Sequence, residues 1–336
     1  MNAVNNLVAA LRDPASVAAL DGDGWSGLIS VARAEVLLGT LAHRVADQAL
    51  PPAVAALLNA ARIAADQAQV HALWEAEMCA RALAPLGVRF VLLKGTAYAA
   101  AGLPCAAGRQ IGDLDILVPR DRLDEVEAAL LGAGWEWVKD DPYDQAYYRQ
   151  HMHELPPLIH GTRDRMIDVH HTILPLTARV APDAAAMLAD SSPLKGGGLY
   201  VLSPADMTIH CAAHLIADGD LAGGLRNLWD FHCLLSTFGD DAFWPALKQR
   251  AAHHQLWPAT HRAARIAHHL FGTPIPLGWQ GWHLSDRLFI RRLTARDGWG
   301  RETRPLTRLA FTIRAHMLRM PPLMLAKHLW AKWRTR

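Results

Sequence analysis

The sequence predicts an α+β protein, in which a small mixed sheet of about five strands is flanked by helical regions at both ends of the chain. Three observations support this prediction. Residues 1–84 are rich in alanine and leucine at helical spacing, residues 85–200 contain several short β-type runs, and residues 201–336 are mostly helical in pattern. With 51% hydrophobic and 20% charged residues, the 336-residue chain has the composition of a folded globular protein.

The N-terminal region is predicted to be helical up to a break at Pro51-Pro52. Apolar residues such as Leu28, Val31 and Leu37 recur there at helical spacing. A second, longer helix is predicted to run from the proline pair to about Leu83 and to end near Gly87.

The middle region is predicted to hold the sheet. Residues 88–93 are a β-type run that ends in Lys94-Gly95-Thr96, which predicts a strand, a turn and then a helix. Residues 114–118 form a second strand that leads through Pro119 into a helix over 122–131. Further short strands are predicted at residues 135–138, 154–159 and 166–170. The triple glycine at 196–198 lacks the Lys-Ser or Lys-Thr of a phosphate loop and is interpreted as a plain turn.

The C-terminal region is predicted to hold five or six helices separated by prolines. Ser203-Pro204, with Asp206 in the first turn, is a typical helix start. After Glu302 the chain has no acidic residue but eight lysines and arginines, so its end is basic although the net charge is only +2. The last segment, residues 321–336, mixes these cations with leucine and tryptophan, and is interpreted as a helix that covers the body or touches an anionic surface.

The main candidate for chemistry is the pair Asp113 and Asp115 in the run Gly-Asp-Leu-Asp-Ile-Leu-Val. Residues two apart in a strand share a face, so both carboxylates point the same way. Two adjacent half-buried anions need a cation, and oxygen ligands favour Mg²⁺ or Mn²⁺, which complete their shell with substrate phosphates. Taken alone, the pair is also compatible with one aspartate that caps a turn and another at a solvated strand edge.

Three further features favour the metal interpretation. Asp168 interrupts another apolar strand and offers a third carboxylate for a two-metal site. Lys94, Gly95 and Thr96 lie at a strand-to-helix turn, where backbone N–H groups favour phosphate. Arg109 could add bidentate contacts to a triphosphate.

These residues resemble a known family. Lys94-Gly95, Arg109, residues 112–118, His153 and residues 167–170 are similar to the uncharacterised nucleotidyltransferase family of bacteria, part of the polymerase-beta-like superfamily, and residues 202–235 resemble its helical half. The resemblance implies a nucleotidyltransferase palm at residues 85–200, metal ligation and catalysis by Asp113, Asp115 and Asp168, and a triphosphate at Gly95-Thr96. Gly95 precedes Asp113 by 18 positions, against about ten in the wider superfamily, so the triphosphate contacts depart from the usual pattern.

The predicted reaction is transfer of a nucleoside monophosphate from a nucleoside triphosphate to a hydroxyl or phosphate, with release of pyrophosphate. The acceptor is left open between a small molecule, a peptide, a protein and RNA. His153 and His170 are expected to border the nucleotide cleft and to bind phosphate or orient Asp168. Two alternatives remain. One is a metal-dependent hydrolase that uses His151, His153, His170 and His171 with Asp168, in which strand alternation would put His151 and His153 on one face. The other is a non-catalytic binding protein of the same fold. His210 and His214 are interpreted as helix packing, with a metal pair as the alternative.

The remaining composition points to the cytoplasm. The four cysteines have no close spacing that would suggest zinc or a redox dithiol. No signal peptide and no long apolar run of about 18 residues is apparent, so no membrane span is expected.

Overall fold

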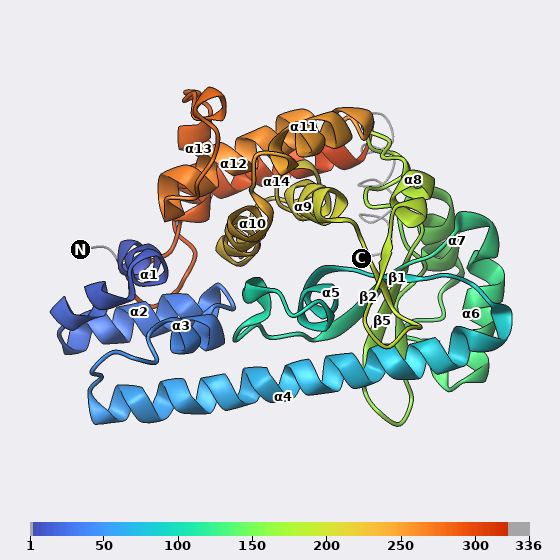
Figure 1. The fold of residues 1–336 in the computed structure, drawn as a ribbon, viewed down its shortest axis with the longest axis horizontal. Helices are drawn as coiled ribbons and strands as arrows, with labels where there is room; N and C mark the ends of the chain where they lie inside the picture. Colours follow the sequence, from blue (N-terminus) through green and yellow to red (C-terminus); the bar gives the residue numbers. More distant parts are fainter. Residues whose placement is uncertain (1–2, 322–336) are drawn as a thin grey trace.

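The computed structural model describes residues 3–321 of the chain. The fold is α+β, as the sequence predicts: a mixed sheet lies at one end, and helices precede it and follow it (Figure 1). The predicted amphipathic segment over residues 321–336 falls almost entirely outside the described part of the chain. Within that part, no helix combines the length and apolar character needed to cross a membrane.

The N-terminal helices are α1 (Ala3–Arg12), α2 (Gly22–Ala34), α3 (Leu38–Arg44) and α4 (Pro52–Leu83). The long helix α4 begins at the second proline of Pro51-Pro52, as predicted, because proline lacks the N–H that a first helical turn leaves unpaired. It contacts α3 near its start and α5, α6 and β2 further along, so it connects the N-terminal helices with the sheet (Figure 1).

The sheet has seven described strands in the order β3-β4-β5-β2-β1-β7-β6. Their bounds are β1 (Val91–Leu92), β2 (Asp113–Leu117), β3 (Trp135–Trp137), β4 (Leu158–His160), β5 (Met166–His170), β6 (Ser192–Pro193) and β7 (Tyr200–Val201). The central pair, β2 and β5, is parallel, whereas β1 runs antiparallel to β2. Apart from Asp115, Asp168 and His170, the residues of β2 and β5 that follow Asp113 and Met166 are buried and apolar, as expected for inner strands.

Helices α5 (Lys94–Ala100), α6 (Leu123–Gly132), α7 (Pro142–His151) and α8 (Ala184–Ala189) accompany the sheet. Short 3₁₀ helices are found in the described part of the chain at Pro14–Ala19, Ala84–Leu86, Pro104–Ala106, Arg120–Arg122 and Leu277–Trp279. Helix α6 follows β2 directly after Pro119, as the sequence predicts.

The C-terminal helices are α9 (Pro204–Ala212), α10 (Gly224–Phe238), α11 (Phe243–His253), α12 (Trp257–Phe271), α13 (Asp286–Leu293) and α14 (Pro305–Arg319). The Ser203 hydroxyl caps α9 by accepting from the Asp206 N–H, as its position predicts. At its other end α9 continues into a π-helix, Ala213–Asp218. π-Helices are rare in proteins, but those that occur are often at functional sites.

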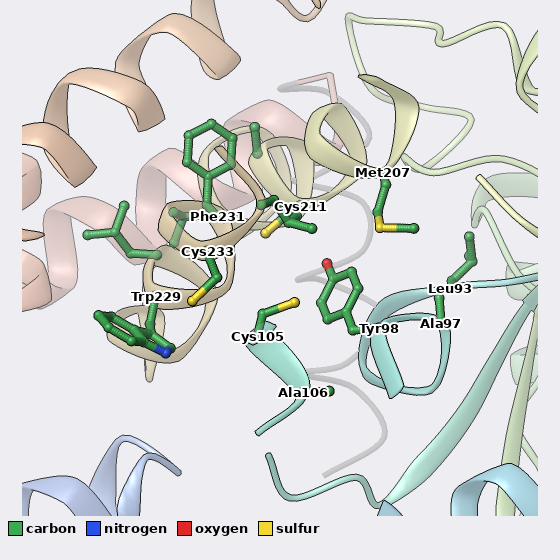
Figure 2. Close-up of a cluster of buried hydrophobic side chains, with 14 of the residues drawn as sticks. Leu93, Ala97, Tyr98, Cys105, Ala106, Met207, Cys211, Trp229, Phe231 and Cys233 are labelled. Carbon is green, nitrogen blue, oxygen red and sulfur yellow. The ribbon is translucent and has the colours of Figure 1, made fainter. Parts of the chain in front are cut away.

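A shared core joins the sheet side to the C-terminal helices. Figure 2 shows side chains from α5, α9 and α10 in one buried cluster, among them Tyr98, Met207, Cys211 and Phe231. Burial of Met207 and of Phe231 contributes about 1.5–3 kcal/mol each. All four cysteines are buried free thiols. The cluster fixes the position of α5, whose first residue is Lys94.

Some strand predictions differ from the structure. Residues 154–159 were expected to form one strand, but β4 starts only at Leu158, and Glu154 makes an isolated bridge to His170. The physical reason is Pro156-Pro157, whose nitrogens cannot donate to a ladder. Residues 88–93 contribute only Val91–Leu92, and the two-residue strands β6 and β7 carry too little pattern to be predicted. Between them, Gly196–198 lie in the expected turn.

Candidate active site

Strands β2 and β5 bring three carboxylates together. They pair in parallel register, so that Asp115 lies directly opposite Asp168, and Asp113 is two residues earlier on the same face as Asp115. Each aspartate offers one oxygen, and the three oxygens lie within 4.8 Å of one another. The structure thus brings together the three carboxylates that the sequence singles out.

The environment of these carboxylates differs from one to the next. Asp115 is buried at 3% exposure, Asp168 is half-buried, and Asp113 lies at the open end of its strand. Burial, and then the charges of Asp115 and Glu154, raise the pKa of Asp168 to about 7. Desolvation and the Asp115 charge also raise the pKa of Asp113. The negative charge of the carboxylates is therefore larger than the single positive charge of Lys94 can neutralise.

Lys94 is the cation that faces this cluster. Its Nζ donates to Asp115 Oδ1 at 2.5 Å. Burial would lower the pKa of Lys94, but the nearby carboxylates, Asp115 first, raise it, so the ammonium stays charged. Burial would likewise raise the pKa of Asp115, but Lys94 and His170 hold it well below its usual range. Lys94 adopts a left-handed backbone (φ 48°), a strain of roughly 1–2 kcal/mol, of the kind that clusters at functional sites.

His170 orients Asp115. Its Nε2 lies 2.9 Å from the same Oδ1 that Lys94 contacts, and its side chain is 2% exposed. The sequence placed His170 at the nucleotide cleft, with phosphate binding or orientation of Asp168 as its role. In the structure its hydrogen bond goes to Asp115, because His170 follows Asp168 by two residues on the same face of the sheet.

Gly95 and Thr96 are buried at the start of α5, directly after Lys94. A Cβ added to Gly95 would lie 2.6 Å from Nε of Arg109, so the glycine allows this side chain to pass beneath the turn. The Thr96 hydroxyl and Arg109 Nε are buried without a hydrogen-bond partner among the described residues. The N–H groups of the first helical turn have no partner inside the helix.

Arg109 has a partner that the sequence did not suggest. Its Nη1 donates to Asp230 of α10, which also accepts from Arg226, and Arg226 donates to Thr40 of α3 at 2.6 Å. The guanidinium predicted to bind a triphosphate is thus in a buried network that ties the Gly95 turn to two helices. Asp230 carries a recognisable signal, a single carboxylate inside the apolar run Leu228-Trp229-Asp230-Phe231.

The histidines divide between the site and other places. His151 is the last residue of α7 and packs on Tyr147, so the expected strand that aligned it with His153 is wrong. His153 lies in a bend with its ring 5.2 Å from that of His170. Burial first, and then the charges of His170 and Lys94, lower the pKa of His153 to about 2. His171 lines a separate, mainly apolar cavity of about 610 Å³.

Glu154 is a site residue that the sequence reasoning missed. Its Oε2 lies 3.5 Å from Nδ1 of His170 and 3.6 Å from Nε2 of His153. Burial raises the pKa of Glu154, and the positive charge of Lys94 acts in the opposite direction. The available signal was its position directly after His153, within a segment otherwise predicted as apolar strand.

The donor set of the three aspartates fits a hard divalent cation. All ligands are carboxylate oxygens, as Mg²⁺ and Mn²⁺ prefer. A bound cation would also remove the repulsion that raises the pKa values of Asp113 and Asp168.

A polar pocket of about 350 Å³ lies on the helical side of the site. It is lined by the π-helix, α10 and α14, with Asp218, Asp220, Asn227, Thr312 and Arg319 among its residues. His214, from the π-helix, also lines it and is within electrostatic range of Lys94 and Asp115. Arg319 Nε donates to Asp218 Oδ1 at 2.8 Å at its edge.

Known proteins resemble this chain to different extents. A solved structure of the antibiotic-resistance factor ANT(2'')-Ia is similar over 57% of this chain and 95% of its own, with 14% sequence identity and a TM-score of 0.37. A search of curated proteins finds no match. The sequence profile described as "Uncharacterised nucleotidyltransferase" matches residues 21–272, three quarters of the chain. The protein therefore belongs to the uncharacterised nucleotidyltransferase family, as its motifs indicate.

Proposed function

We propose that this protein transfers a nucleoside monophosphate from a nucleoside triphosphate to a hydroxyl or phosphate of an acceptor. The acceptor oxygen forms a bond to the α-phosphorus, the bond from that phosphorus to the β-phosphate oxygen breaks, and pyrophosphate leaves. The observation that carries the proposal is the in-register pairing of Asp115 with Asp168 across two parallel strands, with Asp113 beside them. Family membership supports nucleotidyl transfer in general.

Asp113, Asp115 and Asp168 would hold the divalent metal, Mg²⁺ or Mn²⁺. When bound, the metal supplies positive charge that binds the triphosphate and offsets the charge that develops during transfer. Lys94 and His170 hold Asp115 in one orientation through hydrogen bonds to the same oxygen. The rigid carboxylate therefore needs little rearrangement during the reaction.

We propose that Asp168 is the carboxylate that contacts the acceptor. Its side chain is half-buried and lies opposite Asp115, so it could contact both a bound metal ion and an acceptor beside that ion. Asp168 would orient the acceptor hydroxyl and accept its proton as the new P–O bond forms. An acceptor phosphate needs no such proton transfer, so Asp168 matters most for hydroxyl acceptors.

The turn at Lys94, Gly95 and Thr96 would bind the triphosphate. The N–H groups of this first turn have no partner inside α5, and the Thr96 hydroxyl has none among the described residues. With the Lys94 ammonium, which contacts Asp115, they are the donors that we assign to the phosphates. His153 borders the same site. Arg109 supports this turn from below through Gly95, and we propose that it positions the turn.

We place the acceptor in the 350 Å³ pocket between the π-helix and α14. Its volume is at the lower end of pockets that bind small molecules. Two carboxylates, Asp218 and Asp220, line it, so it favours a small polar acceptor with hydroxyl or amino groups. This choice is narrower than the sequence allows, since RNA and proteins would need an open surface.

The experiment measures products from each of the four nucleoside triphosphates with Mg²⁺ or Mn²⁺, first with water as the only acceptor and then with cell extract added. Pyrophosphate and nucleoside monophosphate, or a labelled adduct, support the proposal. Asp113→Asn and Asp115→Asn should abolish these products, whereas Asp121→Asn, on the exposed turn before α6, should not. Failure of every nucleotide with both metals would overturn the proposal and favour a binding protein, and zinc-dependent hydrolysis without nucleotide would favour the hydrolase.

A further inference from the structure

We propose that His153, Glu154 and His170 form a second metal site, which binds a transition metal ion such as Zn²⁺ and is separate from the three aspartates. Each residue offers one ligand atom, and the three atoms lie within 4.8 Å of one another. This proposal does not depend on the transferase reaction, because it concerns only how these side chains are arranged.

The spacing of the ligand atoms fits a tetrahedral ion. Bonds of about 2.0–2.2 Å from zinc to nitrogen or oxygen place neighbouring ligands about 3.4 Å apart in a tetrahedron. Glu154 Oε2 lies 3.5 Å from His170 Nδ1 and 3.6 Å from His153 Nε2. Two of the three distances between ligand atoms are therefore already close to those expected around a bound ion. Both distances exceed a normal hydrogen bond, so these contacts do not satisfy the groups on their own.

His170 has a buried nitrogen aimed into the cluster without a hydrogen-bond partner. Its side chain is 2% exposed, and Nδ1 has no partner among the described residues. Since Nε2 hydrogen-bonds the Asp115 carboxylate, the neutral tautomer with its proton on Nε2 leaves a lone pair on Nδ1 that faces the Glu154 carboxylate. Two electron-rich groups face each other here, and a metal ion between them would bind both.

The hydrogen bond to Asp115 is also what a metal-binding histidine needs. Metal-ligating histidines almost always donate their other N–H to a carboxylate or carbonyl, which fixes the ring and strengthens the ligand. Asp115 would fill this role for His170. His153, whose Nδ1 is also buried without a partner among the described residues, offers its Nε2 on the side of Glu154.

The chain folds so that adjacent residues can point to one ion. His153 lies in a bend, while Glu154 bridges to His170 on β5. The backbone oxygen of His153 accepts from the N–H of His171, which fastens the bend to the strand. The side chains of His153 and Glu154 keep 14% and 19% exposure, so an ion can enter and a water can complete the tetrahedron.

The ligand types separate the two sites chemically. Two imidazoles and one carboxylate favour Zn²⁺ over Mg²⁺, whereas the aspartate cluster offers only oxygen. His170 lies between them, with Asp115 on Nε2 and Glu154 near Nδ1. A metal on Nδ1 would thus fix the His170 ring against the Asp115 carboxylate.

The test is Zn²⁺ binding by the metal-free protein, measured by competition with a chromophoric chelator in an excess of Mg²⁺. We expect one tightly bound Zn²⁺ per chain. The isosteric variant Glu154→Gln and the variant His153→Gln should each weaken binding by at least about 100-fold, more than loss of an outer partner does. X-ray absorption at the zinc edge should show two imidazole ligands.

Two variants serve as controls. Asp113→Asn alters the aspartate cluster, and His171→Gln changes a neighbouring histidine outside the proposed site. Both should bind Zn²⁺ as the unaltered protein does. Circular dichroism identifies any variant that fails to fold. If His153→Gln does not fold, the Zn²⁺ affinity of Glu154→Gln alone decides the test. Unchanged affinity in Glu154→Gln, lost affinity in Asp113→Asn, or no Zn²⁺ binding at all would overturn the proposal.

Discussion

Nζ of Lys94 lies 2.5 Å from Oδ1 of Asp115, and this ion pair joins the first residue of α5 to the central strand β2. Both side chains are largely buried, with exposures of 24% and 4%. A buried carboxylate whose cation is removed is strongly disfavoured in its charged form. The pair therefore holds Asp115 ionised and in place, which a metal ligand requires.

Replacement of Lys94 by methionine should lower nucleoside monophosphate formation by about 100-fold, similar to loss of one preorganised charge-stabilising donor. The measurement is turnover of the most active triphosphate with Mg²⁺. Lys139→Met, which removes an exposed lysine with its own acidic partner, is the matched control and should leave turnover unchanged. Equal activity in the two variants would contradict the assigned role of Lys94.

Gly95→Ala should destabilise the protein, because the new Cβ would lie 2.6 Å from Arg109 Nε and 3.2 Å from Ile111 Cγ1. Overpacking of this kind typically costs about 1–3 kcal/mol. Urea unfolding measures the loss. Gly112→Ala is the control, since no atom lies within 4 Å of its added Cβ. If both variants unfold at the same urea concentration, Gly95 is not needed for the passage of Arg109.

Arg109→Met should destabilise the fold by about 3 kcal/mol, because it leaves a buried partner, Asp230, without one of its two cations. Arg81→Met, which breaks an exposed pair with Glu77, should change the unfolding free energy by less than about 0.5 kcal/mol. A variant of normal stability with a raised KM for the triphosphate would instead support the direct triphosphate contact that the sequence predicts.

The sequence predicts features that depend on neighbouring residues better than features that depend on distant ones. The start and end of α4 follow from Pro51-Pro52 and the helical pattern up to Leu83, and β5 follows from one alternating run. The shared face of Asp113 and Asp115 follows from strand geometry alone. Pairing of Arg109 with Asp230, 121 residues away, depends on how α10 packs on the chain around Pro104–Ala106 and has no local pattern.

The same distinction between local patterns and distant contacts applies to the candidate site. Three carboxylates could be found because Asp115 and Asp168 interrupt apolar strands and Asp113 shares a face with Asp115. The role of Glu154 could not be predicted. The pattern predicts one strand over residues 154–159, but Pro156-Pro157 interrupts it, and Glu154 makes a separate bridge to His170. The strand alternation assumed for His151 and His153 is wrong for a related reason: the chain is still in α7 at His151.

Thr312→Phe should block the acceptor pocket without affecting the nucleotide. Thr312 lines this pocket from α14, and the larger side chain would occupy part of its 350 Å³. With a labelled triphosphate and cell extract as the acceptor source, we expect adduct formation to fall at least tenfold while hydrolysis to the monophosphate persists. Leu309→Phe, on the exposed side of α14, should retain both reactions. Parallel loss of both reactions would place the nucleotide, not the acceptor, in this pocket.

Stability of the metal-free protein should fall as pH rises from about 5 to 8, owing to Asp168. Burial, Asp115 and Glu154 raise its folded pKa to about 7, whereas an unfolded aspartate titrates near 3.9. The folded state therefore holds a proton that the unfolded state has released. The resulting stability is fully present below the unfolded pKa and is lost as pH rises through about 7.

Asp168→Asn cannot lose this proton, so it isolates the effect. Chemical unfolding at pH 5 and pH 8 in a chelator should show a decline in unfolding free energy that is larger in the unaltered protein than in Asp168→Asn, by on the order of 2 kcal/mol. Mg²⁺ should reduce the difference, because a cation bound to the three carboxylates favours their charged forms. A decline of equal size in both proteins would show that Asp168 is not the group responsible, and an effect of Mg²⁺ on Asp168→Asn alone would argue against its role as a ligand.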